Sequence, residues 1–573
     1  MSIQGGDRVF PARPDDFGPW NPGIESQVPK ELRHLATIFR AANVFTSVAA
    51  AGELRGLTGF NLSELVVFRP QRLALHELLV RITADFAVPD GTRIADLGLN
   101  FREIARLLLS RYLEPATDAV TAAYRGAARD VNDVIEPALA RSSRNWGPQE
   151  IAEFEKLAVA ASDAAAAAAY KSLARVLLAL FTTHGAAWGS KDLIASMAAG
   201  MACNDFGSDC IGRTIAPLLL SAARELGYKL LPRQEHPVVI NTKGPSASGK
   251  STLRPLQKKL AGDIGVQWSD FALISPDIWR KQLLDYASLG AAHKYAGAFT
   301  SDEVQIIDQK LDRYMAAKNR RGDMSHLLID RFRFDSFAPD SAEAGSNLLT
   351  RFGQTVYLFF VITPPEMLVE RAWKRGLEFG RYKAVDDTLA HSVEAYSGIP
   401  DVFFTWVRRG DKRIQFEFLD NTVRLGERPR TAAFGDNETF NVLDVKATLD
   451  IERYARIDVD AAAPEYLYPD PQLLAAERNA DFLRRCVKSF HWVNFAEQAS
   501  GRIYLRIERG QPVQKERAAF EAALQSPDTL AAIRAVVPDA LSGSVPEAAR
   551  PAYLNAKDGS ALPPTLGQWG SLP

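Results

Sequence analysis

The chain has little cysteine, almost no net charge and no long apolar run, and each of these absences excludes a class of protein. Three cysteines, Cys203, Cys210 and Cys486, without a C-x-x-C spacing argue against a disulfide framework or a zinc site and favour a reducing compartment. A formal net charge of −1 gives no global attraction to nucleic acid or to an anionic membrane. No apolar run approaches the ~20 residues that cross a bilayer, and residues 1–30 hold no apolar signal-peptide core. We therefore expect a cytoplasmic protein without a membrane partner.

What is present is a chain of 573 residues, 47% of them hydrophobic, which is too long for one hydrophobic core. Changes in residue pattern and composition along the chain predict five parts. These are an extended, proline-rich arm over 1–30, a helical domain over 31–235, alternating strands and helices over 236–425, a mixed region over 426–541, and a poorly ordered tail over 542–573. The helical domain shows no identifiable chemistry, and a regulatory role or a protein partner is open for it.

Local patterns add smaller predictions within these parts. Residues 203–210 are predicted to form a loop, and residues 439–448 and 451–455 to be strand-like or mixed. Residues 471–490 and 513–537 are predicted to be helical.

The alternation over 236–425 is typical of a parallel α/β sheet. Short apolar segments predict five strands, and helical patterns fill the gaps between them. The predicted fold class is an α/β P-loop kinase core, a five-stranded parallel sheet with helices on both faces, preceded by an all-α domain and followed by a mixed α+β C-terminal region. Ligands of such a sheet bind at the carboxyl ends of its strands. The predicted strands are 238–242, 271–275, 326–330, 355–362 and 415–420, and the predicted helices are 250–261, 277–286, 301–319, 365–375 and 384–396.

The turn after the first predicted strand carries the most specific motif. Gly244, Gly249, Lys250 and Ser251 fit G-x-x-x-x-G-K-[ST]. Glycines permit backbone angles that turn successive N–H groups toward a phosphate, and the helix start adds unpaired N–H groups. The lysine is suited to the terminal phosphates of ATP, and the serine hydroxyl is suited to Mg²⁺. The predicted ATP-binding residues are Gly244, Pro245, Ser246, Ala247, Ser248, Gly249, Lys250, Ser251 and Thr252.

A carboxylate follows the second predicted strand, in the segment Ile-Ser-Pro-Asp. Asp277 would stand at the carboxyl edge of the sheet, where it can accept a proton from a substrate hydroxyl that attacks the γ-phosphate. Arg280 lies one helical turn further and can hold a phosphate or orient the carboxylate. The alternative is that Asp277 only caps the helix. Beside a phosphate loop we favour the catalytic role.

The third predicted strand ends in Asp330 after three apolar residues, the form of an acid that holds Mg²⁺ directly or through water. Arg331, Phe332 and Arg333 follow. Two cations beside an aromatic ring suggest contacts to a phosphate or to a ring system. Ordinary surface pairing with Asp335 explains at least one of these arginines.

The helix predicted over 365–375 leads into a cationic segment. Arg371, Lys374 and Arg375 share one helix face, and Arg381 and Lys383 follow two glycines. This arrangement resembles a mobile lid that brings cations onto transferring phosphates. The alternative is a solvated basic helix face.

Together these segments resemble the zeta-toxin and polynucleotide-kinase group of P-loop kinases. The matching pieces are GPSASGKST, ISPDIWRKQ, LLIDRFRFD and ERAWKRGLEFGRY, all within 236–425. The resemblance implies that Lys250 binds the ATP phosphates, that Asp277 is the base that activates the hydroxyl, and that Arg280 assists it. It also implies contacts to the γ-phosphate from lid arginines, which correspond to Arg371 or Arg375, and to Arg381.

The sequence departs from the zeta toxins at the end of the third strand. Zeta toxins carry Glu there with small residues after it, and they act on a UDP-linked amino sugar. Here the acid is Asp330 and bulky residues follow, so the acceptor stays open.

The resulting prediction is a kinase that requires ATP and Mg²⁺ and transfers the γ-phosphoryl group to a hydroxyl of a small nucleotide-like or sugar-nucleotide molecule. Ser251 and Asp330 would hold the metal. Asn421 would border the adenine, because nucleotide kinases commonly hold that ring near the end of the fifth strand. Two alternatives are open: a polynucleotide 5′-hydroxyl kinase, which the neutral charge balance disfavours, and a regulatory ATPase or switch without an acceptor. GTP in place of ATP is also open.

Overall fold

The computed structural model describes residues 17–141, 145–330, 350–424, 426–554 and 562–570. The chain forms two compact units, each assembled from separate stretches of sequence. One unit contains the sheet and comprises Met1–Gln27, Leu231–Ser275 and Met315–Pro573. The other is helical and comprises Val28–Leu230 and Pro276–Tyr314.

The helical unit is built from the predicted all-α region. Its core lies among α5, α6, α7 and α8, where Leu173, Val176 and Leu177 of α7 are fully buried. Alanines on the same helix, such as Ala169, let neighbouring helices approach closely. The helices are α1 (Val48–Thr58), α2 (Leu62–Leu65), α3 (Pro70–Asp85), α4 (Asp96–Leu108), α5 (Thr117–Arg141), α6 (Pro148–Ala160), α7 (Ala164–His184), α8 (Lys191–Ala202) and α9 (Ser208–Leu226).

One helix of this unit corrects an expectation about apolar runs. Among the described residues, α7 is the helix whose length and apolar composition would suffice to cross a membrane. A buried core helix satisfies the same test, and Leu173, Leu177 and Leu180 of α7 lie in the core of the helical unit.

The loop predicted over 203–210 is wrong. A π-helical turn, Cys203–Gly207, leads directly into α9. The polar residues that suggested a loop bind other parts of the unit instead. The Asn204 amide donates to Val66 O at 2.6 Å and accepts from Phe68 N at 3.0 Å, so its side chain pairs with a distant backbone and leaves the helix intact.

The segment after β4 also belongs to the helical unit, although its sequence lies within 236–425. It contains the 3₁₀ turn Pro276–Trp279, the short α11 (Arg280–Leu283), the 3₁₀ segment Ala287–Tyr295 and the start of α12 (Ala296–Arg320). Trp279 is fully buried, and its Nε1 donates to Thr83 Oγ1 at 3.1 Å. A large apolar side chain with one satisfied polar atom thus attaches the segment to α3.

The five predicted strands all form, and they lie in one sheet in the order β7-β6-β3-β5-β4. Every neighbouring pair among them is parallel. Most residues of these strands are buried, as expected when both faces of a sheet are covered, which confirms an α/β architecture. The strands are β3 (Val238–Lys243), β4 (Phe271–Ile274), β5 (His326–Ile329), β6 (Thr355–Ile362) and β7 (Arg413–Asp420).

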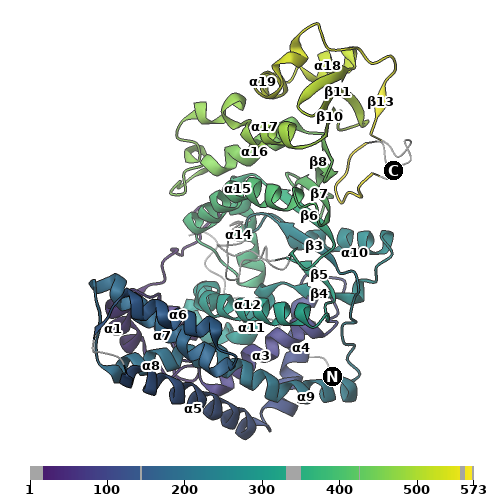
Figure 1. The fold of residues 1–573 in the computed structure, drawn as a ribbon. Helices are drawn as coiled ribbons and strands as arrows, with labels where there is room; N and C mark the ends of the chain where they lie inside the picture. The colour runs from purple at the N-terminus through teal and green to yellow at the C-terminus, as the bar shows by residue number, and fades with distance from the viewer. Residues whose placement is uncertain (1–16, 142–144, 331–349, 425, 555–561, 571–573) are drawn as a thin grey trace. The chain divides into compact units, whose positions relative to one another are not determined.

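Helices flank this part of the sheet. Figure 1 shows α10 (Arg254–Asp263) on the opposite side of the sheet from α14 (Pro365–Phe379) and α15 (Val385–Val407). The helices predicted over 250–261, 365–375 and 384–396 are therefore confirmed, with α15 considerably longer than expected.

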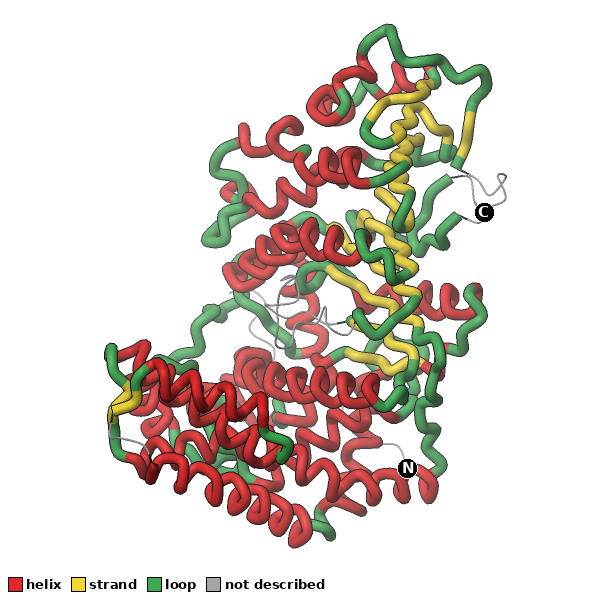
Figure 2. Tube along the Cα trace, in the orientation of Figure 1, coloured by secondary structure: helices red, strands yellow, loops and turns green. Residues whose placement is uncertain are grey.

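The sheet does not end near residue 425 but continues through further strands, as the row of yellow strands in Figure 2 shows. β7 pairs antiparallel with β8, so the predicted division at 425/426 falls between two hydrogen-bonded neighbours. Phenylalanines explain the continuation: Phe403 of α15 packs against Phe416, Phe440 and Phe482, which come from both sides of that division. The added strands are β8 (Arg430–Asp436), β9 (Thr439–Val442), β10 (Trp492–Ala496), β11 (Arg502–Glu508) and β12 (Gln511–Lys515).

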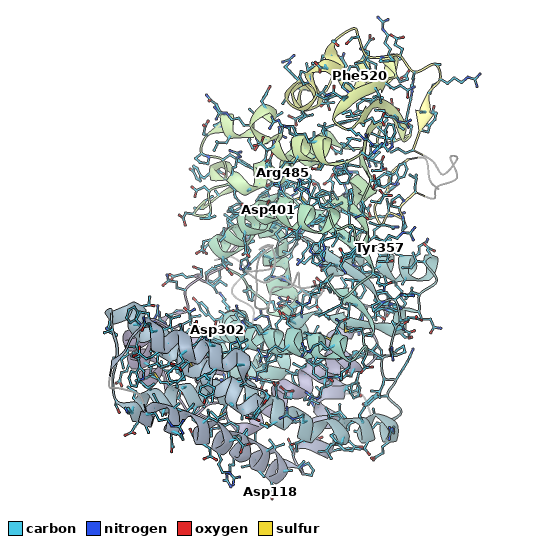
Figure 3. The ribbon with its side chains drawn as sticks, in the orientation of Figure 1. Asp118, Asp302, Tyr357, Asp401, Arg485 and Phe520 are labelled. Carbon is cyan, nitrogen blue, oxygen red and sulfur yellow. The ribbon has the colours of Figure 1, made fainter. Side chains whose placement is uncertain are left out.

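The C-terminal region differs from its predicted elements in detail. Residues 451–455 are helical, in α16 (Val445–Arg453) and the turn after it, and 511–515 form β12 before α18 (Arg517–Ala523) and α19 (Pro527–Val536). The helical prediction over 471–490 is met by two 3₁₀ turns and α17 (Asp481–Ser489). Arg485 of α17 pairs with Asp401 of α15 at 3.1 Å, and both are labelled in Figure 3.

The described parts of the predicted tail take defined positions. Ala552–Tyr553 form β13 and pair with β11. Further on, the backbone N–H groups of Leu566 and Gly567 donate to the carboxylate of Glu417 at 2.6 and 2.9 Å. Residues 542–554 and 562–570 therefore differ from the poorly ordered tail that their prolines suggested, because a buried carboxylate and a strand edge bind their backbone.

Candidate phosphate-binding site

The turn after β3 has the backbone that the glycine motif predicts. Gly244 has a φ of +154° and Gly249 a φ of +96°, and between them Ala247 also has a positive φ of +65°. A left-handed alanine costs on the order of 1 kcal/mol, so the surrounding structure must impose this turn. Directly after Gly249, the helical segment begins with the 3₁₀ turn Lys250–Leu253 and continues into α10.

The turn is held from one side at a single atom, the carbonyl oxygen of Ser248. It accepts hydrogen bonds from Asn421 Nδ2 at 2.6 Å, Thr363 Oγ1 at 3.1 Å and Arg371 Nη1 at 3.3 Å. Because the peptide unit is planar and trans, fixing this carbonyl directs the Gly249 N–H to the opposite side. Three donors from three elements therefore orient one N–H of the loop before any ligand is present.

Arg371 and Asn421 together hold the loop by hydrogen bonds; we call this pair the brace. The other guanidinium nitrogen of Arg371, Nη2, donates to the carbonyls of Asn421 and Val423 at 2.8 and 3.0 Å. Burial is the main cause that lowers the pKa of Arg371 from its usual range. The sequence predicted Arg371 as a catalytic lid cation and Asn421 as a neighbour of adenine. In the structure the hydrogen bonds of both side chains connect α14 and the end of β7 to the loop.

The close approach of Asn421 to the loop requires a glycine at position 249. A Cβ at this position would lie 2.4 Å from Asn421 Nδ2, and the φ is unfavourable for any other residue. Gly249 is thus needed both for the close approach of Asn421 and for the positive φ of the turn.

The two predicted metal ligands lie together. Ser251 Oγ donates to Asp330 Oδ2 at 2.9 Å, and Asp330 follows directly on β5. Arg254, on the first turn of α10, lies 3.8 Å from the same carboxylate oxygen. A hydroxyl at the helix start after the loop and a carboxylate at the end of β5 are oxygen ligands of the kind that Mg²⁺ prefers.

Lys250 extends over the loop. Its Nζ donates to the carbonyls of Gly244 and Pro245, both at 2.9 Å. The ammonium is therefore fixed at the loop rather than free in solvent, while Thr252 Oγ1 donates to Gly249 O at 2.6 Å and reinforces the helix start.

The residues present fit a triphosphate with Mg²⁺. The turn has three left-handed residues, an oriented N–H, an ammonium and a hydroxyl–carboxylate pair, which together match the needs of a phosphate chain with a divalent cation. Among the described residues, no group of three or more His, Cys, Asp or Glu side chains could hold a metal ion alone. A cation at Ser251 and Asp330 would thus take other ligands from phosphate oxygens and water.

The predicted lid is a packed helix. Leu368, Val369 and Ala372 of α14 are buried, and the helix ends at Gly380 in a left-handed cap. Arg375 reaches the loop, with Nη2 3.5 Å from Ser246 Oγ, whereas Lys374 is exposed. The three cations expected on one face therefore divide into two directed at the loop and one in solvent.

Asp277 and Arg280 belong to the helical unit and form a pair within it. Arg280 Nε donates to Asp277 Oδ1 at 2.9 Å. Its Nη1 donates to Gly297 O at 2.7 Å and Thr300 Oγ1 at 2.8 Å, at the start of α12. The carboxylate is half-exposed, while the arginine side chain is only 16% exposed. Arg280 thus holds the Asp277 carboxylate in place.

Arg331, Phe332 and Arg333 lie outside the described residues. Arg381 lies just beyond the cap of α14 and is partly buried.

Sequence reasoning missed Thr363 and Tyr396. Thr363 follows β6, the neighbour of β3, and a polar residue at that strand end could have suggested a role. The Tyr396 hydroxyl accepts from Thr363 N at 2.7 Å and donates to Thr363 O at 2.8 Å. A tyrosine within the apolar pattern of a long helix gives no such signal.

Comparisons with known proteins add little to this geometry. No family model matches the chain, and no curated protein matches it. Among solved structures, a chain from the PezAT chromosomal toxin–antitoxin system of the human pathogen Streptococcus pneumoniae is similar at 18% sequence identity. The match covers 36% of this chain and 74% of that chain, with a TM-score of 0.24. This score is too low for the similarity to show a shared fold or function.

Proposed function

We propose that the chain is a phosphotransferase that uses ATP with Mg²⁺ and transfers the γ-phosphoryl group to a hydroxyl of a small nucleotide-like or sugar-nucleotide molecule. One observation carries the proposal: a pre-oriented phosphate turn with Lys250 above it and the Ser251–Asp330 pair beside it. Such a turn is preorganised before the ligand arrives, which is how charge on a transferring phosphoryl group is best stabilised.

Each residue has a role in this proposal. The Gly249 N–H and the Lys250 ammonium bind phosphate oxygens, and Arg375 adds a cation from α14. Ser251 and Asp330 would hold Mg²⁺, which supplies charge neutralisation on the phosphates. Arg371 and Asn421 position the loop through Ser248 rather than contact the reacting atoms.

Asp277 is the proposed general base. Its carboxylate is half-exposed, and Arg280 fixes its orientation. A carboxylate held in this way accepts the hydroxyl proton as the oxygen attacks phosphorus. Arg280 is then a positioning residue, since its guanidinium is already engaged by α12.

Labelled γ-phosphate from ATP, incubated with the protein and a metabolite extract, tests the proposal. We expect transfer to a small metabolite, loss of ATP binding and transfer in Lys250→Ala, and loss of transfer with intact ATP binding in Asp277→Asn. Asp118→Asn is the matched control, since Asp118 is an exposed aspartate of the same unit, on α5. Its position is labelled in Figure 3.

The same assay separates the alternatives. Transfer to 5′-hydroxyl oligonucleotides that weakens steeply with salt would identify a polynucleotide kinase. ATP hydrolysis without any acceptor, unchanged in Asp277→Asn, would identify an ATPase or switch. Normal transfer in either Lys250→Ala or Asp277→Asn would contradict the assignment of that residue.

A further inference from the structure

A buried cation lies beside the proposed metal ligands and has no role in the function proposed above. Arg254 stands at the start of α10, one helical turn after Lys250, and its side chain is only 9% exposed. Its Nη2 lies 3.8 Å from Asp330 Oδ2, the carboxylate oxygen that also accepts the Ser251 hydroxyl. The guanidinium is thus connected to the site through the carboxylate that we propose to hold Mg²⁺.

The contacts of this guanidinium leave it incompletely satisfied. A guanidinium carries several N–H donors, and the 3.8 Å separation from Asp330 is too long for a hydrogen bond. Among the described residues, the buried Arg254 Nε has no hydrogen-bond partner. Because a buried charge is costly unless it is paired, this cation depends on Asp330 as its counter-charge.

Arg254 would lose this counter-charge when Asp330 binds a divalent cation. The carboxylate would then be neutralised by the metal, and two positive charges would repel each other. Salt screens such a repulsion only weakly, because the Arg254 side chain is largely buried. Arg254 therefore opposes binding of the metal alone.

A triphosphate bound with the metal would reverse this effect. The complex of Mg²⁺ with a triphosphate carries a net negative charge, so the same guanidinium attracts it. The unsatisfied Nε is also a donor of the kind that phosphate oxygens accept. One buried positive charge thus has opposite effects on the metal alone and on the metal with a triphosphate.

We propose that Arg254 is the counter-cation of Asp330 and couples the two ligands of the site: it disfavours binding of a divalent cation alone and favours binding of the cation together with a triphosphate. The inference rests on the proposed binding of Mg²⁺ and ATP at the loop. It adds a residue and a coupling between two ligands that the phosphotransferase proposal does not contain.

Two binding measurements on the full-length protein test this coupling. Mn²⁺, which takes oxygen ligands as Mg²⁺ does, is titrated without nucleotide and followed by electron paramagnetic resonance. A non-hydrolysable ATP analogue with Mg²⁺ is titrated by calorimetry. In Arg254→Met, where an uncharged side chain fills the buried position, we expect the dissociation constant for Mn²⁺ to fall about tenfold and that for the Mg²⁺–analogue complex to rise about tenfold. A merely structural role would not move the two constants in opposite directions.

Two further variants complete the experiment. Arg254→Gln removes the same charge and should reproduce both changes, so the result does not depend on one replacement. Lys259→Met removes a positive charge from α10 at a position that is 73% exposed, and both constants should stay within about twofold of wild type.

The contrary outcomes are distinct. The inference is overturned, and the phosphotransferase proposal left intact, if the two constants do not move in opposite directions in Arg254→Met and Arg254→Gln. Absence of measurable Mn²⁺ binding to both variants would overturn it as well. Absence of analogue binding to wild type would overturn both proposals.

Discussion

At the scale of single residues, the turn that we propose to bind phosphate is held by residues outside its sequence motif. The motif residues Gly249, Lys250 and Ser251 face the phosphates in the proposed function. The conformation of the turn depends on the Ser248 carbonyl and on its donors Thr363, Arg371 and Asn421. None of the three donors belongs to the motif.

Asn421→Ala tests this dependence. The substitution removes the 2.6 Å hydrogen bond to Ser248 O, and a hydrogen bond of this kind is worth about 1 kcal/mol. We expect the dissociation constant for Mg·ATP, measured by calorimetry, to rise about fivefold to tenfold. The change arises because the Gly249 N–H is less well oriented.

The matched control is Asn494→Ala in the same sheet. Asn494 is another buried amide, and its Nδ2 donates to Asn441 Oδ1 at 2.9 Å on β9, away from the loop. The Asn494→Ala substitution should lower the free energy of unfolding and leave the dissociation constant for Mg·ATP unchanged. Equal affinities for wild type and Asn421→Ala would show that the brace is dispensable.

At the scale of elements, α12 is attached to the helical unit by buried charge. Glu303 of α12 is fully buried and accepts from Arg72 Nε at 2.5 Å and Nη2 at 2.7 Å. His76, also fully buried, lies 2.7 Å from the same carboxylate. Burial lowers the pKa of His76 to about 4, so the imidazole is neutral near pH 7 and the ion pair is that of Glu303 with Arg72.

Glu303→Gln is therefore expected to be strongly destabilising. It leaves the Arg72 guanidinium buried without its counter-charge, and breaking a buried pair in this way typically costs about 3–5 kcal/mol. Urea unfolding followed by circular dichroism measures the loss. Glu53→Gln, at an exposed position on α1 of the same unit, should change the free energy of unfolding by less than about 0.5 kcal/mol. A comparable stability for both variants would show that the pair contributes nothing.

At the scale of the whole molecule, each compact unit combines stretches that are distant in sequence. The sheet unit joins its β7 to a segment about 150 residues later, because Glu417 binds the N–H groups of Leu566 and Gly567. The Thr431 hydroxyl donates to the same carboxylate at 2.7 Å. Gly567 is required there, since a Cβ would lie 2.5 Å from Thr431 Oγ1.

This carboxylate makes the stability of the sheet unit depend on pH. Burial raises the pKa of Glu417 from 4.5 to about 7. A pKa raised on folding means that stability is fully present below pH 4.5 and is lost as the pH rises toward 7. Relative to Glu417→Gln, wild type should lose about 2–3 kcal/mol of unfolding free energy between pH 5 and pH 7.5.

Urea unfolding of both proteins at the two pH values measures this difference. Glu508→Gln on β11, where the carboxylate is 40% exposed, provides the control and should follow wild type at both. A constant difference between wild type and Glu417→Gln across the pH range would contradict the expectation.

The sequence alone predicted those features of the fold and of the candidate site that depend on residues close together in the chain. The five strands of the parallel sheet follow from short apolar runs, and the turn from Gly244 to Ser251 follows from a fixed spacing of glycines, lysine and serine. Asp330 could be placed beside Ser251 because parallel strands end at one edge of the sheet. Each of these inferences needs only local pattern and the rules of strand packing.

Only the tertiary structure decided the remaining features, because these features depend on contacts between residues that are distant in sequence. Periodicity could not show that β7 would pair with β8 and extend the sheet, or that Trp279 would bind the segment after β4 to the helical unit. The hydrogen bonds of Arg371 and Asn421 could not be predicted for the same reason: only folding brings these donors to the Ser248 carbonyl. A motif specifies which groups can bind a phosphate, but long-range hydrogen bonds decide how they are held.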